Sequence, residues 1–434
     1  MKNSLILFLL LLIGSYSYSQ SEQLISKQEV IEKVIANNNN IKISEQDVLM
    51  AKGDYNQTNA ILLPEVSISY TGITTTNPLM AFGSKLNQEI LTANDFNPTL
   101  LNNPSKIEDY STKIEIKQPL INVDGIFQRK AAKAKLEAIT LKSERTKDYI
   151  YFEVEKSYMQ LQLAYKTVEV LEKAKTAALE NKRIADNSFK QGYLQRADVL
   201  SIEVRVTDIE NQLQYAKSNI KNTSNYLSVL MNDTSYSILK PIDNLEVAEL
   251  EVLDQIISDD RADIQAMKLS SDAYKQMYKA DKSSFLPRLN AFGNYELHDD
   301  KVFQGDANGY LLGAQLSWTI FEGSKRLGKT QKSKAEYEKA KLNFDNYKAQ
   351  SQVELYSVNR MLQDAKNNLQ LSQLALEQSQ ESLRIRTNRF KEGLEKTSDL
   401  LISESQYAQK QLEYYATVYQ HNYALAYYKY LTKK

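Results

Sequence analysis

The residue types that carry out most enzyme and metal chemistry are scarce in this chain of 434 residues. It has no cysteine and only two histidines, His298 beside Asp299 and Asp300, and His421 near the C-terminus. A catalytic or metal cluster would have to assemble across chains, and we find no nucleophile, metal or phosphate-binding motif. We therefore predict that the protein is not an enzyme and has neither a metal nor another cofactor.

Two aspartates stand out because each follows a glycine at the same spacing. The stretches FKQGYLQRADVL and FKEGLEKTSDLL place Asp198 six residues after Gly192 and Asp399 six residues after Gly393. A glycine can adopt the left-handed conformation that ends a helix. A carboxylate shortly afterwards favours the positive end of the next helix dipole. Each stretch therefore predicts a turn between two helices.

Long helices must position these turns. From residue 126 to 240, and from residue 329 to the C-terminus, there is no proline and a single glycine, Gly192 and Gly393 respectively. Each stretch is therefore expected to be nearly all helix, broken once. We predict helical hairpins over about 126–231 and about 324–431, with the two glycines at their tips.

The hairpin arms carry residues at the spacing of a coiled coil. These positions alternate by four and three residues, which places them on one seam. At 1.5 Å per residue, a helix from Gly125 to Gln191 would extend on the order of 100 Å, so we expect a rod or part of a tube. The seam residues are Val154, Tyr158, Leu161, Tyr165 and Val168, then Leu355, Val358, Leu362, Ala365, Leu369, Ser372 and Leu376.

Short strands precede each hairpin, in the same order in two repeats. Leu63-Pro64 introduces EVSISYTG, Leu286-Pro287 introduces RLNAFGNY, and a glycine leads from the second strand of each repeat into the hairpin. Alternation of apolar and polar residues predicts these strands. The first repeat covers 20–257 and the second 258–434. The strands are expected at about 65–74 and 111–120, and at about 288–297 and 310–321.

The strands have an apolar face that no second sheet in the chain would cover. On the last strand, the shared face consists of Leu312, Ala314, Leu316, Trp318 and Ile320. Tilted strands of about ten residues can cross a membrane, with lipid outside and water inside, but the smallest membrane barrels need about eight strands. Several chains must therefore share a barrel. The predicted fold is mainly α with a small β part: a trimeric α-helical tunnel capped by a 12-stranded transmembrane β-barrel, with four strands per chain.

The N-terminus and the overall charge give further constraints. Lys2 precedes the apolar run Leu5 to Ile13 and a short stretch that suits signal peptidase, so we interpret residues 1–19 as a signal peptide. The 54 basic and 54 acidic side chains balance, which gives no indication of a nucleic-acid partner. Without cysteines, a large exported chain must be stabilised by packing or by assembly.

The order of these motifs resembles the TolC-like outer-membrane efflux family. The features that carry the resemblance are the doubled unit, the Leu-Pro before each first strand, the Gly-x5-Asp turns, Arg261-Ala262-Asp263-Ile264 at the opening of the second repeat, and the loop from Asn77 to Pro98. Together they span roughly residues 25–430. The resemblance implies a homotrimer in the outer-membrane lipid of a Gram-negative cell, with a tunnel through the periplasm. It further implies a periplasmic adaptor (membrane fusion) protein and an inner-membrane pump as partners, in tripartite efflux or type I secretion.

The resemblance also implies roles for the hairpin tips. In the family the tips close the periplasmic entrance, so Asp198 and Asp399 would form two rings of three carboxylates that attract cations. Helix capping is the alternative role, and one carboxylate can have both. Some members have a second acid where this chain has Ile402, with Glu404 as the nearest substitute, and a closing arginine where it has Glu395. Expected adaptor contacts, or otherwise plain solvated surface, are Lys190, Gln191, Lys391 and Glu392.

Two alternatives stay open at this point. The loop from Asn77 to Pro98 would lie outside the cell, either as a lid over the bore or packed on its neighbours in the trimer. The rival function is a periplasmic coiled-coil scaffold or adaptor without a pore. It would explain the heptads and the export signal, but not four alternating strands at matched places in two repeats.

Overall fold

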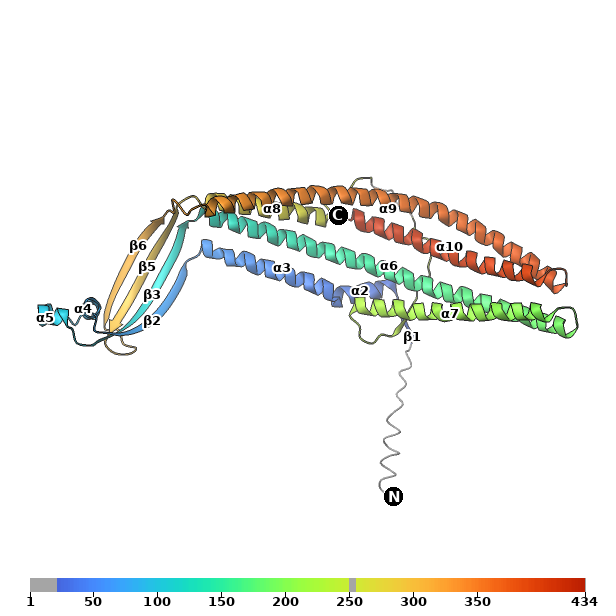
Figure 1. The fold of residues 1–434 in the computed structure, drawn as a ribbon, viewed down its shortest axis with the longest axis horizontal. Coiled ribbons are helices and arrows are strands. Elements are labelled where there is room, and N and C mark those ends of the chain that lie inside the picture. Colours follow the sequence, from blue (N-terminus) through green and yellow to red (C-terminus); the bar gives the residue numbers. More distant parts are fainter. Residues whose placement is uncertain (1–21, 250–254, 434) are drawn as a thin grey trace, which may run out of the picture. The chain divides into compact units, whose positions relative to one another are not determined.

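The computed structural model describes residues 22–249 and 255–433, so the predicted signal peptide lies outside the described residues. They divide into two compact units, each of which draws on both sequence repeats (Figure 1). The sheet unit combines Asp47–Leu141 with Ile264–Asn346. The hairpin unit combines the chain up to Gln46 with Lys142–Asp263 and with the chain from Tyr347 onward. The expectation of a mainly helical fold with a small β part is confirmed.

Four long strands form the sheet of the sheet unit. They pair antiparallel in the order β2-β3-β5-β6, and the register sets Ile68 opposite Ile114 and Lys113 opposite Glu296. Lys113 Nζ lies 2.8 Å from Glu296 Oε1, so this cross-strand pair is also an ion pair. Among the described residues β2 and β6 each have one partner, which leaves the sheet open. The strands are β2 (Glu65–Thr75), β3 (Ile107–Ile121), β5 (Arg288–Asp299) and β6 (Ala307–Ser317).

The two outer strands expose apolar side chains. Ile68 on β2 is 72% exposed and Leu312 on β6 is 74% exposed, and the polar residues between such positions are exposed as well. Alternation therefore leaves one apolar face and one polar face, and the chain itself covers neither along these strands. An apolar face of this kind needs a covering from outside the chain.

The last strand ends earlier than its sequence pattern predicts. β6 stops at Ser317, so Trp318 and Ile320 lie beyond it, although both continue the alternation. Hydrogen bonds to other parts of the chain replace the ladder here. Trp318 Nε1 donates to the carbonyl oxygen of Phe285 at 2.9 Å, and Arg326 donates to the carbonyl oxygen of Thr319.

The segment from Asn77 to Pro98, expected as a loop, contains helical structure. Asn77 accepts a hydrogen bond from the amide of Met80 at 3.2 Å and precedes a proline, which together start a helix. Gln88 Nε2 donates to Asp109 Oδ1 at 3.0 Å and so attaches the segment to β3. Its elements are α4 (Pro78–Asn87), the 3-10 helix η2 (Ala93–Phe96) and α5 (Pro98–Asn102). Leu79, 82% exposed, has no covering within the unit.

Helices adjoin the strands of the sheet unit. Arg129 joins three of them, because its Nη2 donates to Tyr55 Oη at 2.9 Å and its Nη1 donates to Thr58 Oγ1 at 3.1 Å. The helices that lie wholly or partly in this unit are α3 (Asn39–Gln57), η1 (Thr58–Ile61), α6 (Val123–Lys190), α8 (Ala262–Ser283) and α9 (Lys325–Lys391).

The hairpin unit is built on the predicted coiled-coil seams. Val154, Tyr158 and Leu161 of α6 are buried in a cluster with residues of α7, and Leu362 of α9 is buried against Leu425 of α10. Burial of this stripe follows from its spacing, since residues three and four apart share one helix face. The further helices of this unit are α2 (Lys27–Asn37), α7 (Arg196–Met231) and α10 (Thr397–Thr432).

Tyrosines at every fourth position of α10 line one of its faces. Tyr423 and Tyr427 have ring centroids 6.0 Å apart, and Phe152 of α6 lies 5.3 Å from Tyr427. The face therefore joins α10 to α6 by aromatic packing.

A small sheet was not anticipated from the sequence. The sequence predicts an irregular stretch after the first hairpin, from about 232 to 257, yet β4 (Ile238–Pro241) in that stretch pairs parallel with β1 (Glu22–Ile25). Strands of four residues are too short for alternation to be recognised. Over the described residues, no helix carries an apolar stretch long enough to cross a membrane.

Candidate functional site

The first hairpin tip is a tight turn around Gly192. This glycine has φ +80°, which side chains disfavour, and its amide donates to the carbonyl oxygen of Phe189 at 2.9 Å. The amide of Tyr193 donates to the carbonyl oxygen of Ser188, also at 2.9 Å. This pair of hydrogen bonds satisfies carbonyls at the end of α6, as in a Schellman motif.

Asp198 lies in the first turn of the returning helix at this tip. Its Oδ2 accepts a hydrogen bond from the amide of Gln195 at 3.2 Å, and Gln195 is the N-cap residue of α7. The carboxylate thus satisfies a backbone donor at the positive end of the helix dipole. The structure therefore gives Asp198 a capping contact.

The second tip repeats the turn around Gly393. Its φ is +74°, and its amide donates to the carbonyl oxygen of Phe390 at 3.0 Å. The amide of Leu394 donates to the carbonyl oxygen of Arg389 at 2.9 Å. The same backbone conformation therefore serves both glycine stretches.

The carboxylates of the second tip have different partners. Glu395 accepts hydrogen bonds from Arg386 Nη1 and Arg389 Nε, both at 2.8 Å, and its side chain is only 10% exposed. Asp399 lies 3.9 Å from Arg386 Nη1. This acidic and basic cluster was missed from the sequence. The signal was present, because two arginines three residues apart face an acid just past the glycine.

The residues expected to contact an adaptor lie beside the two glycines. Lys190 and Gln191 precede Gly192, Lys391 and Glu392 precede Gly393, and all four side chains are exposed. The structure thus brings these residues together in two sets, one at each tip.

Near the tips, Glu404 lies in the contact between the two hairpins. Its side chain is 8% exposed and accepts a hydrogen bond from Asn181 Nδ2 of α6, whereas the neighbouring Ile402 is 55% exposed. Burial raises the pKa of Glu404, although the hydrogen bond from Asn181 and the charge of Arg205 oppose this. Glu404 therefore does not replace the second acid that some family members have at the position of Ile402, because its carboxylate is buried between helices.

A small cavity adjoins this carboxylate. It has a volume of about 100 Å³ and is lined by the polar side chains of Lys173, Arg205, Glu404 and Gln411 and by apolar and aromatic side chains of α6, α7, α9 and α10. Within the described part of the chain, neither Glu404 Oε2 nor Arg205 Nε has a hydrogen-bond partner.

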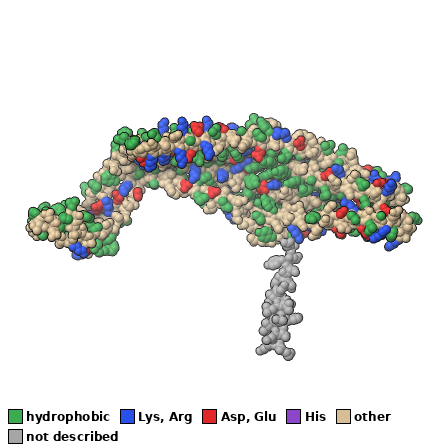
Figure 2. All heavy atoms as spheres, in the orientation of Figure 1, with side chains coloured by type: hydrophobic (Ala, Val, Ile, Leu, Met, Phe, Trp, Pro, Cys, Tyr) green, Lys and Arg blue, Asp and Glu red, His purple; other side chains and the backbone are tan. Residues whose placement is uncertain are grey.

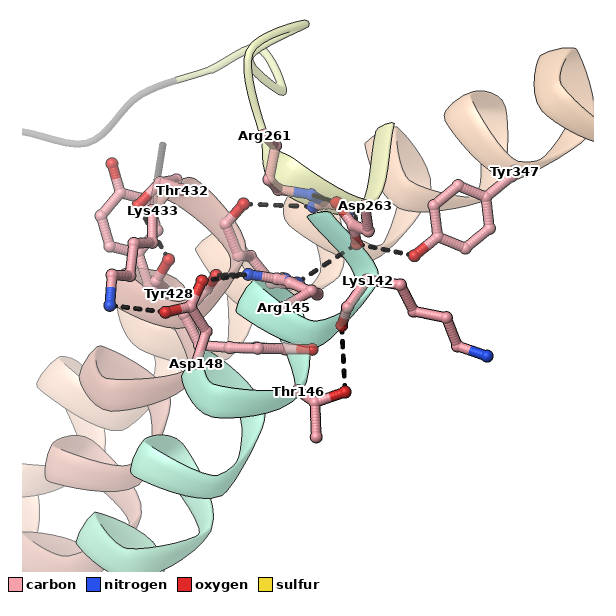
Figure 3. A network of polar contacts seen from close by, with 12 residues as sticks. Lys142, Arg145, Thr146, Asp148, Arg261, Asp263, Tyr347, Tyr428, Thr432 and Lys433 are labelled. Atoms are coloured by element: carbon pink, nitrogen blue, oxygen red, sulfur yellow. Dashed lines mark hydrogen bonds and ion pairs between the residues drawn. The ribbon is translucent and has the colours of Figure 1, made fainter. Parts of the chain in front are cut away.

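At the other end of the hairpins, a buried polar network joins their bases (Figure 3). Arg261 is 2% exposed, and its Nε lies 2.6 Å from Asp263 Oδ1. Its Nη1 donates to the carbonyl oxygen of Leu431 at 3.1 Å and its Nη2 donates to Ser351 Oγ at 2.8 Å. The Arg-Ala-Asp-Ile motif therefore connects α9 to the end of α10.

Asp263 is the centre of this network. Arg145 of α6 places its Nε 3.2 Å from Asp263 Oδ2, and Tyr347 Oη donates to the same oxygen at 2.7 Å. Burial alone would raise the pKa of Asp263, but the hydrogen bonds from Arg261 and Tyr347 hold it below its usual range. Burial and this same carboxylate raise the pKa of Tyr347 to about 12.

The two histidines have ordinary structural partners. His298 Nδ1 lies 3.1 Å from Asp109 Oδ1 in the sheet unit, and His421 is buried in α10 with its Nδ1 3.3 Å from Asn422 Oδ1. In the described ranges, no group of three or more histidine, cysteine, aspartate or glutamate residues could hold a metal ion.

The family model named outer membrane efflux protein matches residues 30–233 and 253–426. The chain belongs to this family. The resemblance indicated by the sequence motifs is thereby confirmed, and the chain is an outer-membrane protein of efflux transport. No curated protein matches the chain significantly.

Solved structures share the fold of this efflux protein at low sequence identity. VceC from Vibrio cholerae is 15% identical, with 93% of this chain and 95% of that chain covered and a TM-score of 0.78. The Campylobacter jejuni CmeC outer membrane channel is 17% identical, with 96% and 90% covered and a TM-score of 0.78. The Neisseria gonorrhoeae MtrE channel, solved in its open state, is 14% identical, with 94% and 88% covered and a TM-score of 0.77.

Proposed function

We propose that three copies of this chain form one conduit across the outer membrane and the periplasm. The open sheet carries this proposal, because β2 and β6 each have one partner among the described residues and expose apolar side chains. Four strands are too few for a barrel, since the smallest membrane barrels have about eight. Three copies supply twelve strands, enough for a barrel around a water-filled bore.

The helical hairpins would continue this conduit as a tunnel in the periplasm. Substrates would pass through it without any bond being made or broken. The buried seams of both hairpins support this role, because they hold long helices side by side without a compact globular core.

The tips would form the periplasmic entrance and contact an adaptor protein that links the channel to an inner-membrane pump. This arrangement would serve a tripartite efflux or a type I secretion system. The exposed positions of Lys190, Gln191, Lys391 and Glu392 support an adaptor contact, because they flank the turns and are free of the hairpin core.

Three copies would also place Asp198 and Asp399 in two rings of carboxylates. Both side chains are partly exposed at the tips, where rings of like charge attract cations. Gly192 and Gly393 would set the level of each ring by fixing the turn. Capping by Asp198 is compatible with such a ring, because the hydrogen bond from Gln195 uses only one of its oxygens.

The proposal is tested by single-channel conductance of the purified protein in a planar bilayer, together with its oligomeric size in detergent. We expect a trimer that forms cation-preferring pores. The double variant Asp198→Ala, Asp399→Ala should lose much of the cation preference. A double variant at Lys190 and Lys391, both changed to glutamine, is the matched control for charge at the tips. A monomer in detergent, or membrane-inserted trimers that never conduct, would contradict the conduit.

Extraction separates the channel from the rival periplasmic scaffold. A scaffold washes off membranes in high salt, whereas a protein with strands in the membrane requires detergent. Release of this chain by salt alone would favour the scaffold.

A further inference from the structure

Basic residues gather where the helices of the sheet unit meet its strands. The chain as a whole is balanced, with 54 basic and 54 acidic side chains. In contrast, residues 325–335 contain five basic residues and no acidic one, residues 123–135 four and one, and residues 275–283 three and one. Figure 2 shows such side chains, in blue, over the beginning of α9 and over α8. We call these twelve the basic collar: Arg129, Lys130, Lys133, Lys135, Lys275, Lys279, Lys282, Lys325, Arg326, Lys329, Lys332 and Lys334.

Chain connectivity fixes the collar at one edge of the sheet. β3 ends at Ile121 and α6 begins at Val123, α8 ends at Ser283 just before β5, and α9 begins at Lys325 soon after β6. Three helices therefore carry their basic ends to the same boundary between strands and helices. The excess is local to this boundary, because the parts of the same helices that lie farther from the strands are mixed in charge.

Half of the collar has an acidic partner within the chain, and the other half has no such ion pair with a described residue. The paired residues are Lys133, Lys135, Lys325, Arg326, Lys329 and Lys332. Asp124 pairs with Arg288, a further cation outside the collar, and Asp281 lies 2.8 Å from Lys329 Nζ. Lys325 pairs with Glu322 at 2.8 Å, yet its side chain is 76% exposed. Surface pairs of this kind contribute little binding energy and leave the ammonium groups accessible.

Exposed aromatic and apolar side chains lie between the collar and the strands. Trp318 is 61% exposed, Ile320 79% and Phe321 84%, and all three lie between the end of β6 and the start of α9. Along the chain, the order is thus apolar strand face, exposed aromatic and apolar residues, then lysines and arginines. A bilayer presents the complementary order of hydrocarbon, interface and charged headgroups.

We propose that the basic collar binds the anionic headgroups of phospholipids in the leaflet that meets the helical side of the sheet. This inference rests on the proposed conduit, because it requires the sheet to cross the membrane. Phospholipid is favoured over a free anion because the collar is continuous with the exposed apolar stretch that would enter the same leaflet. Such contacts would fix the depth of the sheet in the membrane.

The test uses the full-length protein in bilayer discs of phosphatidylcholine that carry a small fraction of spin-labelled lipid. The fraction of spin-labelled lipid whose motion the protein restricts is measured with labelled phosphatidylglycerol and again with labelled phosphatidylcholine. One lysine near a membrane surface favours an anionic lipid by about fivefold, so we expect a preference of that order for phosphatidylglycerol. The preference should fall in high salt for the unmodified protein, a result that depends on no variant.

The collar variant changes Lys130, Lys282 and Lys325 to glutamine, all exposed and close to the boundary. Its preference should fall at least threefold. The control variant changes Lys339, Lys341 and Lys366, also exposed and on α9. Lys339 is fourteen residues beyond the start of α9, about 21 Å along the helix and more than twice the Debye length of about 8 Å. The control should keep the preference.

Other outcomes would overturn the inference, and they are distinguishable from failure of the conduit. Equal restriction of both lipids by the unmodified protein would mean that the collar does not select headgroups. Unchanged lipid preference with altered conductance in the collar variant would place these lysines on the bore. Lost binding to purified peptidoglycan, again with unchanged lipid preference, would assign the collar to the cell wall. If neither label is restricted and no pores form, the membrane conduit itself is wrong.

Discussion

The two hairpin tips have the same backbone and different carboxylate chemistry. Both turns place a glycine at positive φ and close with the same pair of amide hydrogen bonds. At the first tip, Asp198 accepts from the backbone of its own helix start. At the second, Glu395 holds two arginines and Asp399 lies near one of them. A repeated sequence pattern thus fixes the turn, while the residues around it decide what each acid does.

The arginine cluster gives the largest expected difference between the tips. Glu395→Ala leaves Arg386 and Arg389 without their shared carboxylate, and charge-assisted hydrogen bonds at a partly exposed site contribute about 1–2 kcal/mol in total. We expect faster amide hydrogen exchange at the second tip and trypsin cleavage after Arg389.

Glu392→Ala is the control for this change, because Glu392 is an exposed acid at the same tip and makes no ion pair with a described residue. It should leave exchange and cleavage as they are. If Glu395→Ala behaves like the control, the arginines do not hold the tip.

Alanine substitution should destabilise the two tips equally at their glycines, because both turns have the same backbone conformation. Alanine at Gly192 or Gly393 meets no atom within 4 Å, so its cost comes only from the positive φ and should be about 1 kcal/mol at either tip. Hydrogen exchange in the adjoining turns of helix measures this cost. Gly328→Ala, inside α9 and also in open space, should instead stabilise its helix. Unequal costs at the two tips would mean that their backbones differ.

Alanine at the two aspartates should cost different amounts of local stability, and both costs should be smaller than that of Glu395→Ala. Asp198→Ala removes a capping acceptor and should cost about 0.5–1 kcal/mol in the first turn of α7. Asp399→Ala removes only an ion pair at 3.9 Å between partly exposed groups, for which about 0–0.5 kcal/mol is expected. Exchange rates in the first turns of α7 and α10 compare the two. Equal losses would show that the acids have the same structural role.

Local patterns predicted the turns and seams because each depends on a few neighbouring residues. Gly192 and Gly393 mark positions that need a left-handed backbone, and Val154 and Leu362 recur at the period of a helix face. The contacts of Glu404 with Asn181, or of Arg145 with Asp263, join residues far apart in sequence. No periodicity or spacing reports such pairs. The end of β6 before Trp318 was missed for the same reason, since the indole of Trp318 donates to the distant carbonyl of Phe285.

The smallest expected effect concerns Glu404, which joins the second hairpin to the first. Its folded pKa is raised, so the folded state holds a proton that the unfolded chain has already released. Stability is therefore greatest below the unfolded pKa, falls as pH rises toward the folded pKa, and stays reduced above it.

Glu404→Gln can still accept the hydrogen bond from Asn181 but has no proton to release. The melting temperature of the variant should exceed that of the unmodified protein at about pH 8, and the two should converge at about pH 4. Glu413→Gln is the control, because ion pairing with Lys410 lowers the pKa of that exposed acid and reverses the sign of the slope it contributes. A melting curve for Glu404→Gln that keeps the same dependence on pH would mean that the contact between the hairpins already admits water to the carboxylate, as at an ordinary surface acid.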